Sequence, residues 1–224
     1  MEQIRLVTQR QPASLAQQEP VQVHVVDDDA AVRAALARLL RSLDYDVVLH
    51  ADAEAFLEAH DPEAAGCILL DVSMPGLDGP GLQERLRSRG DLTPIIFLTG
   101  AADVPVCAAA MRNGAVDFLM KPVDADELVR AITMALHHDA VRRQSRELRH
   151  ATESRLASLT PREREVLDHV MNGRLNKQIA SDLGTAEKTV KVHRARAMEK
   201  MHVRSVAELV RMVERARFGA VRPD

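Results

Sequence analysis

Five polar side chains directly follow short apolar segments in the first 121 residues of the sequence. They are Asp27 and Asp28 after residues 21–26, Asp71 after 67–70, Thr99 after 95–98, and Lys121 after 116–120. Three carboxylates brought together repel one another unless a divalent cation such as Mg²⁺, which prefers oxygen ligands, lies among them. A carboxylate can attack a phosphoryl group, and a hydroxyl and an ammonium group can bind the phosphoryl oxygens. These residue types therefore indicate phosphoryl transfer.

The segments that carry these side chains alternate between predicted strands and predicted helices. Strands are predicted at 21–26, 46–50, 67–70, 95–98 and 116–120, with helices across 32–43, 52–59, 82–86, 104–113 and from 124 onward. Five apolar strands, each followed by a helix, predict an α/β doubly wound five-stranded parallel sheet of the flavodoxin-like kind. Ligands of such sheets lie outside the carboxyl ends of the strands. The five polar side chains are therefore expected on one rim.

Each of these residues has a simpler interpretation when it is taken alone. An Asp pair after a strand is more often a helix cap, Lys121 is more often a solvated surface lysine, and Phe118 is more often a core residue. Their joint placement at successive strand ends favours a functional site. The rival enzyme is an aspartyl-phosphate phosphatase, which needs a second carboxylate two residues after its nucleophile, where this chain has Ser73.

Residues 21–138 resemble the receiver domain of two-component response regulators. The matching motifs are Val-Val-Asp27-Asp28-Asp29, Leu-Leu-Asp71-Val-Ser-Met-Pro75-Gly-Leu-Asp-Gly79, Leu-Thr99-Gly100 and Asp-Phe118-Leu-Met-Lys121-Pro122, in the order and spacing of that family. The resemblance implies that Asp71 accepts the phosphoryl group. It also implies that Asp28, Asp71 and the backbone carbonyl of Ser73 ligate Mg²⁺, with Asp27 acting directly or through water.

The same resemblance implies a switch made of Thr99 and Phe118, a phosphate-binding Lys121, and a cis Lys121–Pro122 bond. More narrowly, Asp103-Val-Pro-Val and Asn113-Gly-Ala-Val-Asp-Phe118 resemble the oxygen-responsive nitrogen-fixation regulator subfamily. That subfamily commonly has His-Gly after its Thr-Gly pair, where this chain has Ala101-Ala102. The departure falls on the loop that follows Thr99.

The composition argues against a secreted or membrane-spanning protein. Cys67 and Cys107 lie in apolar runs without metal-ligand spacing or a disulfide framework. Residues 1–20 are polar, Gln-rich and without period, which predicts a flexible tail and not a signal peptide. No stretch is long and apolar enough for a membrane span. We expect a cytoplasmic bacterial protein.

The charge distribution indicates two modules with different partners. Residues 155–224 contain 15 Lys+Arg and 9 Asp+Glu, a net charge of +6, whereas residues 1–154 carry a net charge of −9. Between the modules, residues 139–157 lack Pro and Gly and are predicted as a helical linker. A solvated charged linker without helix is an equal alternative.

Residues 158–224 are predicted to form a small all-α four-helix domain with a helix-turn-helix. Thr160-Pro161-Arg162-Glu163 is a capping box with Pro at the first helical position, so a helix begins there and ends at Asn172-Gly173. Further helices are predicted over 176–183, from a Thr185 cap to about Met201, and from Ser205 onward.

The third of these helices favours DNA binding. At 100° per residue, Val190, Ala197 and Met201 fall on one side and are expected in the core. The opposite side is narrow and cationic, which suits the major groove, while nearby cations suit the phosphates. The predicted DNA-binding residues are Lys177, Lys188, Thr189, Lys191, Val192, His193, Arg194 and Arg196. A solvated basic face is the common alternative for any single helix.

Residues 159–213 resemble the four-helix DNA-binding domain of the LuxR type, found in quorum-sensing and nitrate-response regulators. The matching residues are Leu159-Thr-Pro-Arg-Glu163, Glu165-Val-Leu, Asn176-Lys-Gln-Ile-Ala180 and Lys188-Thr-Val-Lys-Val-His193. The resemblance places the family's DNA-contact positions on Lys188, Lys191, Val192 and Ala195. It also implies dimer contacts by the fourth helix, through Val206, Leu209 and Val210.

The two resemblances together predict a response regulator transcription factor and not an enzyme with a separate substrate. They imply a sensor histidine kinase that phosphorylates Asp71, a homodimer formed on phosphorylation, and double-stranded DNA and RNA polymerase as partners. A constitutive DNA-binding protein with an inactive receiver is the second function class. The intact set of five polar residues argues against it.

Overall fold

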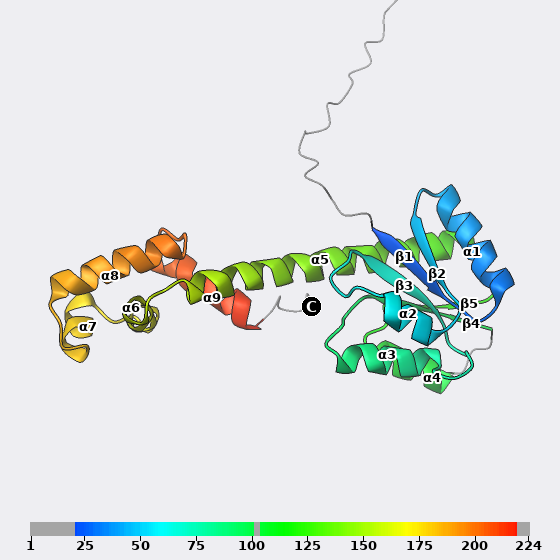
Figure 1. The fold of residues 1–224 in the computed structure, drawn as a ribbon, viewed down its shortest axis with the longest axis horizontal. Coiled ribbons are helices and arrows are strands. Elements are labelled where there is room, and N and C mark those ends of the chain that lie inside the picture. Colours follow the sequence, from blue (N-terminus) through cyan, green and yellow to red (C-terminus); the bar gives the residue numbers. More distant parts are fainter. Residues whose placement is uncertain (1–20, 101–103, 219–224) are drawn as a thin grey trace, which may run out of the picture. The chain divides into compact units, whose positions relative to one another are not determined.

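The computed structural model describes residues 21–100 and 104–218 (Figure 1). The predicted tail at 1–20, the Ala101-Ala102-Asp103 segment and the last six residues lie outside the described residues. The chain forms two compact units that divide between Asp139 and Ala140.

The first unit is built on a parallel five-stranded sheet, as predicted. Its strands lie in the order β2 (Asp46–His50), β1 (Gln22–Val26), β3 (Gly66–Asp71), β4 (Ile95–Thr99) and β5 (Asp117–Met120). Val26 pairs with Leu70, and Asp71 pairs with Leu98, so the carboxyl ends of the central strands are level. The strand order reverses between β1 and β3, which is where doubly wound sheets bind ligands.

Helices cover both faces of this sheet (Figure 1). They are α1 (Ala30–Ser42), α2 (Ala53–Ala59), α3 (Gly79–Ser88), α4 (Val104–Arg112) and the first part of α5 (Ala125–Ala157). Successive strand residues point to opposite faces. Val25 therefore packs with residues of α1 and α5, whereas Val26 packs with residues of α2, α3 and α4. The buried residues of both cores are aliphatic apart from Cys67 on the first face and Phe56, Phe97 and Met74 on the second.

Helix α5 is one continuous helix of 33 residues and includes the whole of the segment 139–157. Near its middle, Asp139 is buried and its Oδ2 accepts a hydrogen bond of 3.1 Å from the backbone N–H of Gly66, at the start of β3. Acidic and basic side chains are spread along the helix. No helix within the described residues is both long and apolar enough to cross a membrane.

The second unit contains four short helices that follow the end of α5. They are α6 (Pro161–Met171), α7 (Asn176–Asp182), α8 (Glu187–Lys200) and α9 (Val206–Phe218). The capping box is present at α6, with Thr160 and Glu163 each accepting from the other's backbone N–H. Val190, Ala197 and Met201 are buried as predicted. The predicted Thr185 cap is wrong, because the residue that precedes α8 is Ala186, whose side chain cannot accept a hydrogen bond.

Candidate functional site

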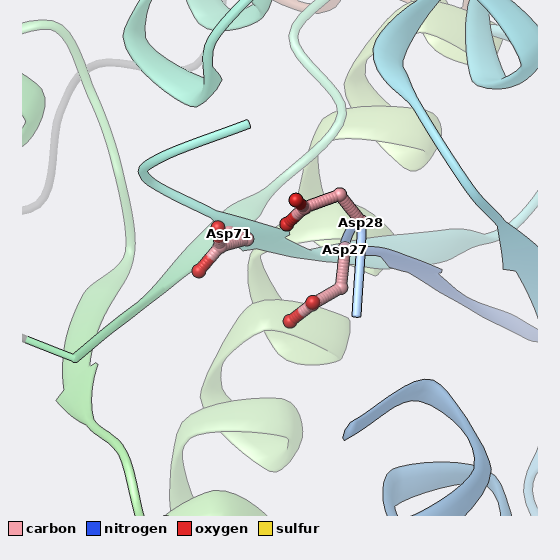
Figure 2. A group of neighbouring side chains, drawn as sticks. All are labelled: Asp27, Asp28 and Asp71. Atoms are coloured by element: carbon pink, nitrogen blue, oxygen red, sulfur yellow. The ribbon is translucent and has the colours of Figure 1, made fainter. Parts of the chain in front are cut away.

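Three carboxylates meet at the carboxyl ends of β1 and β3 (Figure 2). Asp27 and Asp28 follow β1, Asp71 is the last residue of β3, and one oxygen of each lies within 4.8 Å of the others. Asp27 is 0% exposed and Asp71 is buried, whereas Asp28 faces solvent. The prediction that these carboxylates lie together at the carboxyl edge of the sheet is confirmed by this geometry.

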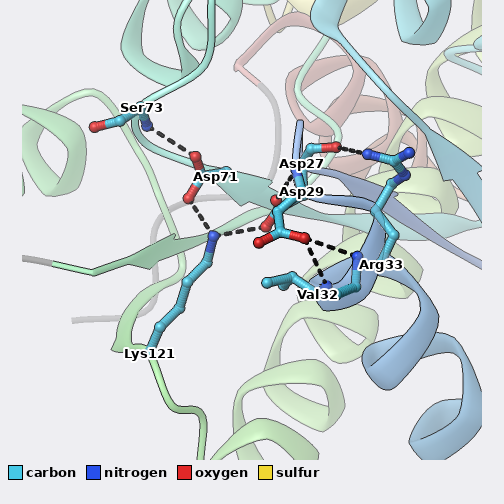
Figure 3. Close-up of polar contacts among 8 residues, drawn as sticks. Asp27, Asp29, Val32, Arg33, Asp71, Ser73 and Lys121 are labelled. Carbon is cyan, nitrogen blue, oxygen red and sulfur yellow. Dashed lines mark hydrogen bonds and ion pairs between the residues drawn. The ribbon is translucent and has the colours of Figure 1, made fainter.

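Lys121 lies between two of these carboxylates (Figure 3). Its Nζ donates to Asp27 Oδ2 at 2.6 Å and to Asp71 Oδ1 at 2.5 Å. Burial by itself lowers the pKa of Lys121, but the hydrogen bonds to both carboxylates outweigh it and hold the pKa above its ordinary value. Burial raises the pKa of Asp71, and the hydrogen bond from Lys121 partly opposes that rise. The ammonium group thus compensates charge that the buried position would otherwise disfavour.

Backbone groups fix the two buried carboxylates in place. The Ser73 N–H donates to Asp71 Oδ2 at 3.1 Å, and the Asp29 N–H donates to Asp27 Oδ1 at 2.9 Å. Arg33, which the sequence did not single out, donates to the backbone carbonyl of Asp27 at 2.6 Å (Figure 3). Gly79 lets the loop pass close to β3, because a Cβ there would lie 2.3 Å from the carbonyl oxygen of Asp71.

The other predicted receiver residues lie on β4 and β5, Thr99 as the last residue of β4 and Phe118 within β5. Thr99 is buried, and its backbone carbonyl accepts from the Lys121 N–H at 2.6 Å. Phe118 is half-buried, with its ring 6.1 Å from that of Phe97. The Lys121–Pro122 peptide bond is cis, as predicted.

The donor set of this pocket fits a hard divalent cation. Among the described residues, Asp27, Asp28 and Asp71 are the one cluster of possible ligands close enough to share an ion. All three offer carboxylate oxygens, which Mg²⁺ and Ca²⁺ prefer over the nitrogen and sulfur ligands of zinc. The exposed carboxylate of Asp28 leaves one side of the cluster open to solvent.

The second candidate site is the exposed side of α8. Lys188, Thr189, Lys191 and Val192 are exposed, as are Arg196 on the same helix and Lys177 on α7. Lys191 forms an ion pair of 2.9 Å with Glu187 one turn earlier. Such exposed pairs are weak and easily exchanged, so the side keeps its capacity to bind an anion.

Two predicted DNA-binding residues of α8 are half-buried instead of fully exposed. His193 has its Nδ1 buried without a hydrogen-bond partner among the described residues, which leaves Nε2 as the atom for an outside contact. Arg194 donates from Nη1 to the side-chain oxygen of Asn176, at 3.0 Å. Asn176 belongs to the motif Asn176-Lys-Gln-Ile-Ala180, and nothing in the sequence pairs it with Arg194.

The predicted dimer contact through Leu209 on α9 is wrong. Leu209 is 0% exposed and belongs to the core formed with Leu167, Ala197 and Met201. A side chain that its own domain covers completely cannot also contact a second chain without unfolding. Val206 and Val210 are only half-buried and keep surface for such a contact.

Comparison with protein families matches both parts of the chain. Residues 23–133 match the family described as response regulator receiver domain, and residues 157–213 match the bacterial regulatory proteins of the luxR family. The first match covers the acidic pocket and the second covers α8.

Similar proteins extend over both matches. The transcriptional regulatory protein FixJ of Azorhizobium caulinodans is 45% identical over 194 residues, which are 87% of this chain and 92% of that protein. The tetrathionate response regulatory protein TtrR of Salmonella typhimurium is 43% identical over 86% of this chain and 92% of its own length. The solved structure of the response regulator StyR is 47% identical, with a TM-score of 0.79 over 87% of this chain and 98% of that chain.

Proposed function

Because the chain belongs to the response regulators that join a receiver domain to a LuxR-type DNA-binding domain, we propose that phosphorylation of Asp71 controls its binding to promoter DNA. The observation that carries the proposal is the pairing of Asp71 with Lys121 beside two further carboxylates at the carboxyl edge of the sheet. A carboxylate able to act as a nucleophile, a cation and carboxylates able to ligate a metal therefore share one pocket, which supports the proposal.

We assign Mg²⁺ to the three carboxylates Asp27, Asp28 and Asp71, with the backbone carbonyl of Ser73 as a further ligand. When bound, the ion would neutralise charge on the phosphoryl donor and orient it. One oxygen of Asp27 and one of Asp71 accept from backbone N–H groups, and the other two accept from Lys121, so both carboxylates are oriented before an ion binds.

The proposed reaction transfers a phosphoryl group from a phosphohistidine of a sensor histidine kinase. An oxygen of Asp71 attacks phosphorus, the phosphorus–nitrogen bond breaks, and its electron pair stays with the kinase imidazole. Lys121 then releases Asp71 Oδ1 and pairs with a phosphoryl oxygen, while the Thr99 hydroxyl donates to another. Thr99 and Phe118 thereby link the phosphate to β4 and β5.

We propose that this link alters the face formed by α4 and β5 and favours a homodimer there. That face carries large apolar side chains in solvent, with Val104 72% exposed, Met120 55% and Met111 45%. Burying such a surface against a second copy would be favourable. Val206 and Val210 would add a second dimer contact on α9.

The proposed output is sequence-specific binding to double-stranded DNA, followed by an effect on RNA polymerase. In a homodimer, two α8 helices would enter adjacent major grooves, with Lys188, Thr189, Lys191 and Val192 nearest the bases. Lys177, Arg194 and Arg196 would contact phosphates, and His193 would contribute through Nε2. Phosphate contacts would set affinity and salt dependence without reading sequence.

An Asp71→Asn variant tests the acceptor. The full-length protein, with Mg²⁺ and the small donor acetyl phosphate, is expected to gain one phosphoryl group by intact mass and to shift toward dimer in sedimentation. Asp71→Asn should show neither change. Asp44→Asn, which alters an exposed carboxylate in the turn before β2, serves as the matched control and should behave as wild type.

Two results would contradict the proposal. Label gained by Asp71→Asn would show a different acceptor. Phosphorylated wild type with unchanged dimerisation and unchanged DNA affinity would favour a constitutive DNA-binding protein.

A further inference from the structure

A cationic hollow of about 330 Å³ lies beside α8 in the second unit. Its polar lining comes from Asn176, Lys191, Arg194, Arg204 and Ser205, and alanine, methionine and valine side chains form the rest. Three cationic residues therefore contribute to its lining, one of which, Lys191, also pairs with Glu187 outside it, and none of the described residues that line it is a carboxylate. Such a concentration of positive charge in a concave surface favours an anion.

Arg194 is held within this hollow by a specific hydrogen bond. Its Nη1 donates to Asn176 Oδ1 at 3.0 Å, and both side chains are half-buried. Asn176 is the first residue of α7, so the bond joins the two helices of the helix-turn-helix. The bond uses one of the five N–H groups of the guanidinium, whose planar fork suits two oxygens of a phosphate.

We propose that this hollow binds one phosphate of the DNA backbone and that Asn176 is a positioning residue that holds Arg194 toward it. The proposal rests on the proposed DNA-binding function and adds a defined contact to it. Without Asn176, the long Arg194 side chain would sample more rotamers, and binding would have to fix it at an entropic cost.

The position of the hollow favours DNA over other anions. Lys191 lines it and also belongs to the exposed side of α8, together with Lys188 and Val192. A strand whose bases contact α8 would therefore bring its backbone past the hollow. The rival occupant is a carboxylate from a second copy of this chain, since Val206 also lines the hollow.

The test measures affinity of the full-length protein for a fluorescent DNA duplex of arbitrary sequence, by anisotropy, between 50 and 200 mM salt. Arg194→Ala should weaken binding about tenfold and reduce the slope of log K against log salt by about 0.9, the value for one phosphate contact. Asn176→Ala should weaken binding roughly three- to fivefold, because Arg194 is still present but no longer oriented.

The double variant separates positioning from a general structural role. Adding Asn176→Ala to Arg194→Ala should cause no further loss, since Asn176 acts only through Arg194. Asn172→Ala, which removes an exposed asparagine at the end of α6, is the matched control and should bind as wild type. Thermal melting followed by circular dichroism reports whether the variants remain folded.

Three results would overturn the inference. The first is wild-type DNA affinity of Asn176→Ala. The second is a loss of affinity on adding Asn176→Ala to Arg194→Ala that equals the loss it causes in the wild type. The third is a change in the sedimentation of Arg194→Ala without a change in its DNA affinity. The last would identify the second copy as the occupant. Failure of the wild type itself to bind any duplex would instead contradict the proposed function.

Discussion

The acidic pocket and the exposed side of α8 hold charge in opposite ways. In the pocket, Asp27 and Asp71 are buried, and Lys121 and backbone N–H groups fix each carboxylate at a short distance. On α8, Lys188 and Lys191 project into solvent, and the ion pair of Lys191 with Glu187 is exposed. The charges of the acidic pocket are therefore neutralised by groups within the fold. The charges on α8 are exposed and can interact with a binding partner.

This difference separates stability from binding. Removing a partner of a buried charge leaves the remaining charge without compensation and destabilises the domain. Removing an exposed charge changes stability little but changes a salt-dependent interaction. Substitutions in the acidic pocket should therefore change stability more than binding, and substitutions on the exposed side of α8 should change binding more than stability.

Lys121→Ala should cost the first unit about 3 kcal/mol, the lower end for breaking a buried charge pair, because Lys121 is 21% exposed. The Asp27 and Asp71 carboxylates would then face each other without a cation. Hydrogen exchange in urea, followed in peptides from residues 21–138, measures the loss, and added Mg²⁺ should recover part of it. A loss below about 0.5 kcal/mol would mean that the pocket behaves as a surface site.

His24→Val should remove a pH dependence from the first unit. His24 lies on β1 with Nδ1 3.1 Å from His50 Nε2, and burial lowers its pKa from 6.5 to about 4. The unfolded chain binds a proton below pH 6.5 that the folded unit excludes, so wild-type stability should fall by roughly 2 kcal/mol between pH 6.5 and 4.5. The same exchange experiment at the two pH values should give a smaller fall in the variant. An unchanged fall would assign the dependence elsewhere.

Thr160→Ala should cost the second unit about 1 kcal/mol, since it removes the side-chain acceptor of a capping box. The other half of the box persists, because Glu163 Oε2 still accepts from the residue-160 N–H and from Lys200 at 2.7 Å. Lys200 and that N–H also hold the pKa of Glu163 near 2. Exchange in peptides from residues 158–218 measures the cost. Thr160→Ser keeps the acceptor and should retain wild-type stability.

Lys188→Ala should change the stability of the second unit by less than about 0.5 kcal/mol. It should nevertheless weaken DNA binding and lower the salt slope by about 0.9 if the lysine contacts a phosphate. If it contacts a base, the slope should change less and the preference among duplex sequences should relax. A stability loss comparable to that of Lys121→Ala would contradict the conclusion that the exposed charges of α8 contribute to binding and not to stability.

The parallel direction of the strands explains why the acidic pocket was predictable from the sequence. In a parallel sheet the residue after each strand must lie on one edge, so finding Asp27, Asp71 and Thr99 after apolar runs was enough to bring them together. The sequence did not reveal that Lys121 bonds to two carboxylates at once. Neither did it reveal the hydrogen bond from Arg33 to the carbonyl of Asp27. Every residue has a backbone carbonyl, so the residue types alone do not indicate such a bond.

Helix α9 shows that periodicity predicts which residues are apolar and share a face, but not what covers them. Val206, Leu209, Val210 and Val213 recur at helical spacing and form an apolar stripe. The pattern cannot say whether the domain's own core or a second chain covers each residue, and Leu209 proved to be core. The hydrogen bond between Arg194 and Asn176 depends on how α7 and α8 pack against each other. The spacing of residues within either helix does not predict that packing.

The hydrogen bond from the Gly66 N–H to Asp139 determines where the chain can be truncated to give a stable isolated receiver. The receiver match ends at residue 133, and a fragment trimmed to that point would lose the carboxylate that satisfies a buried amide at the head of β3. An unsatisfied buried donor costs about 1–3 kcal/mol. An isolated receiver should therefore extend through Asp139, and one that stops earlier should melt lower for reasons unrelated to its phosphorylation chemistry.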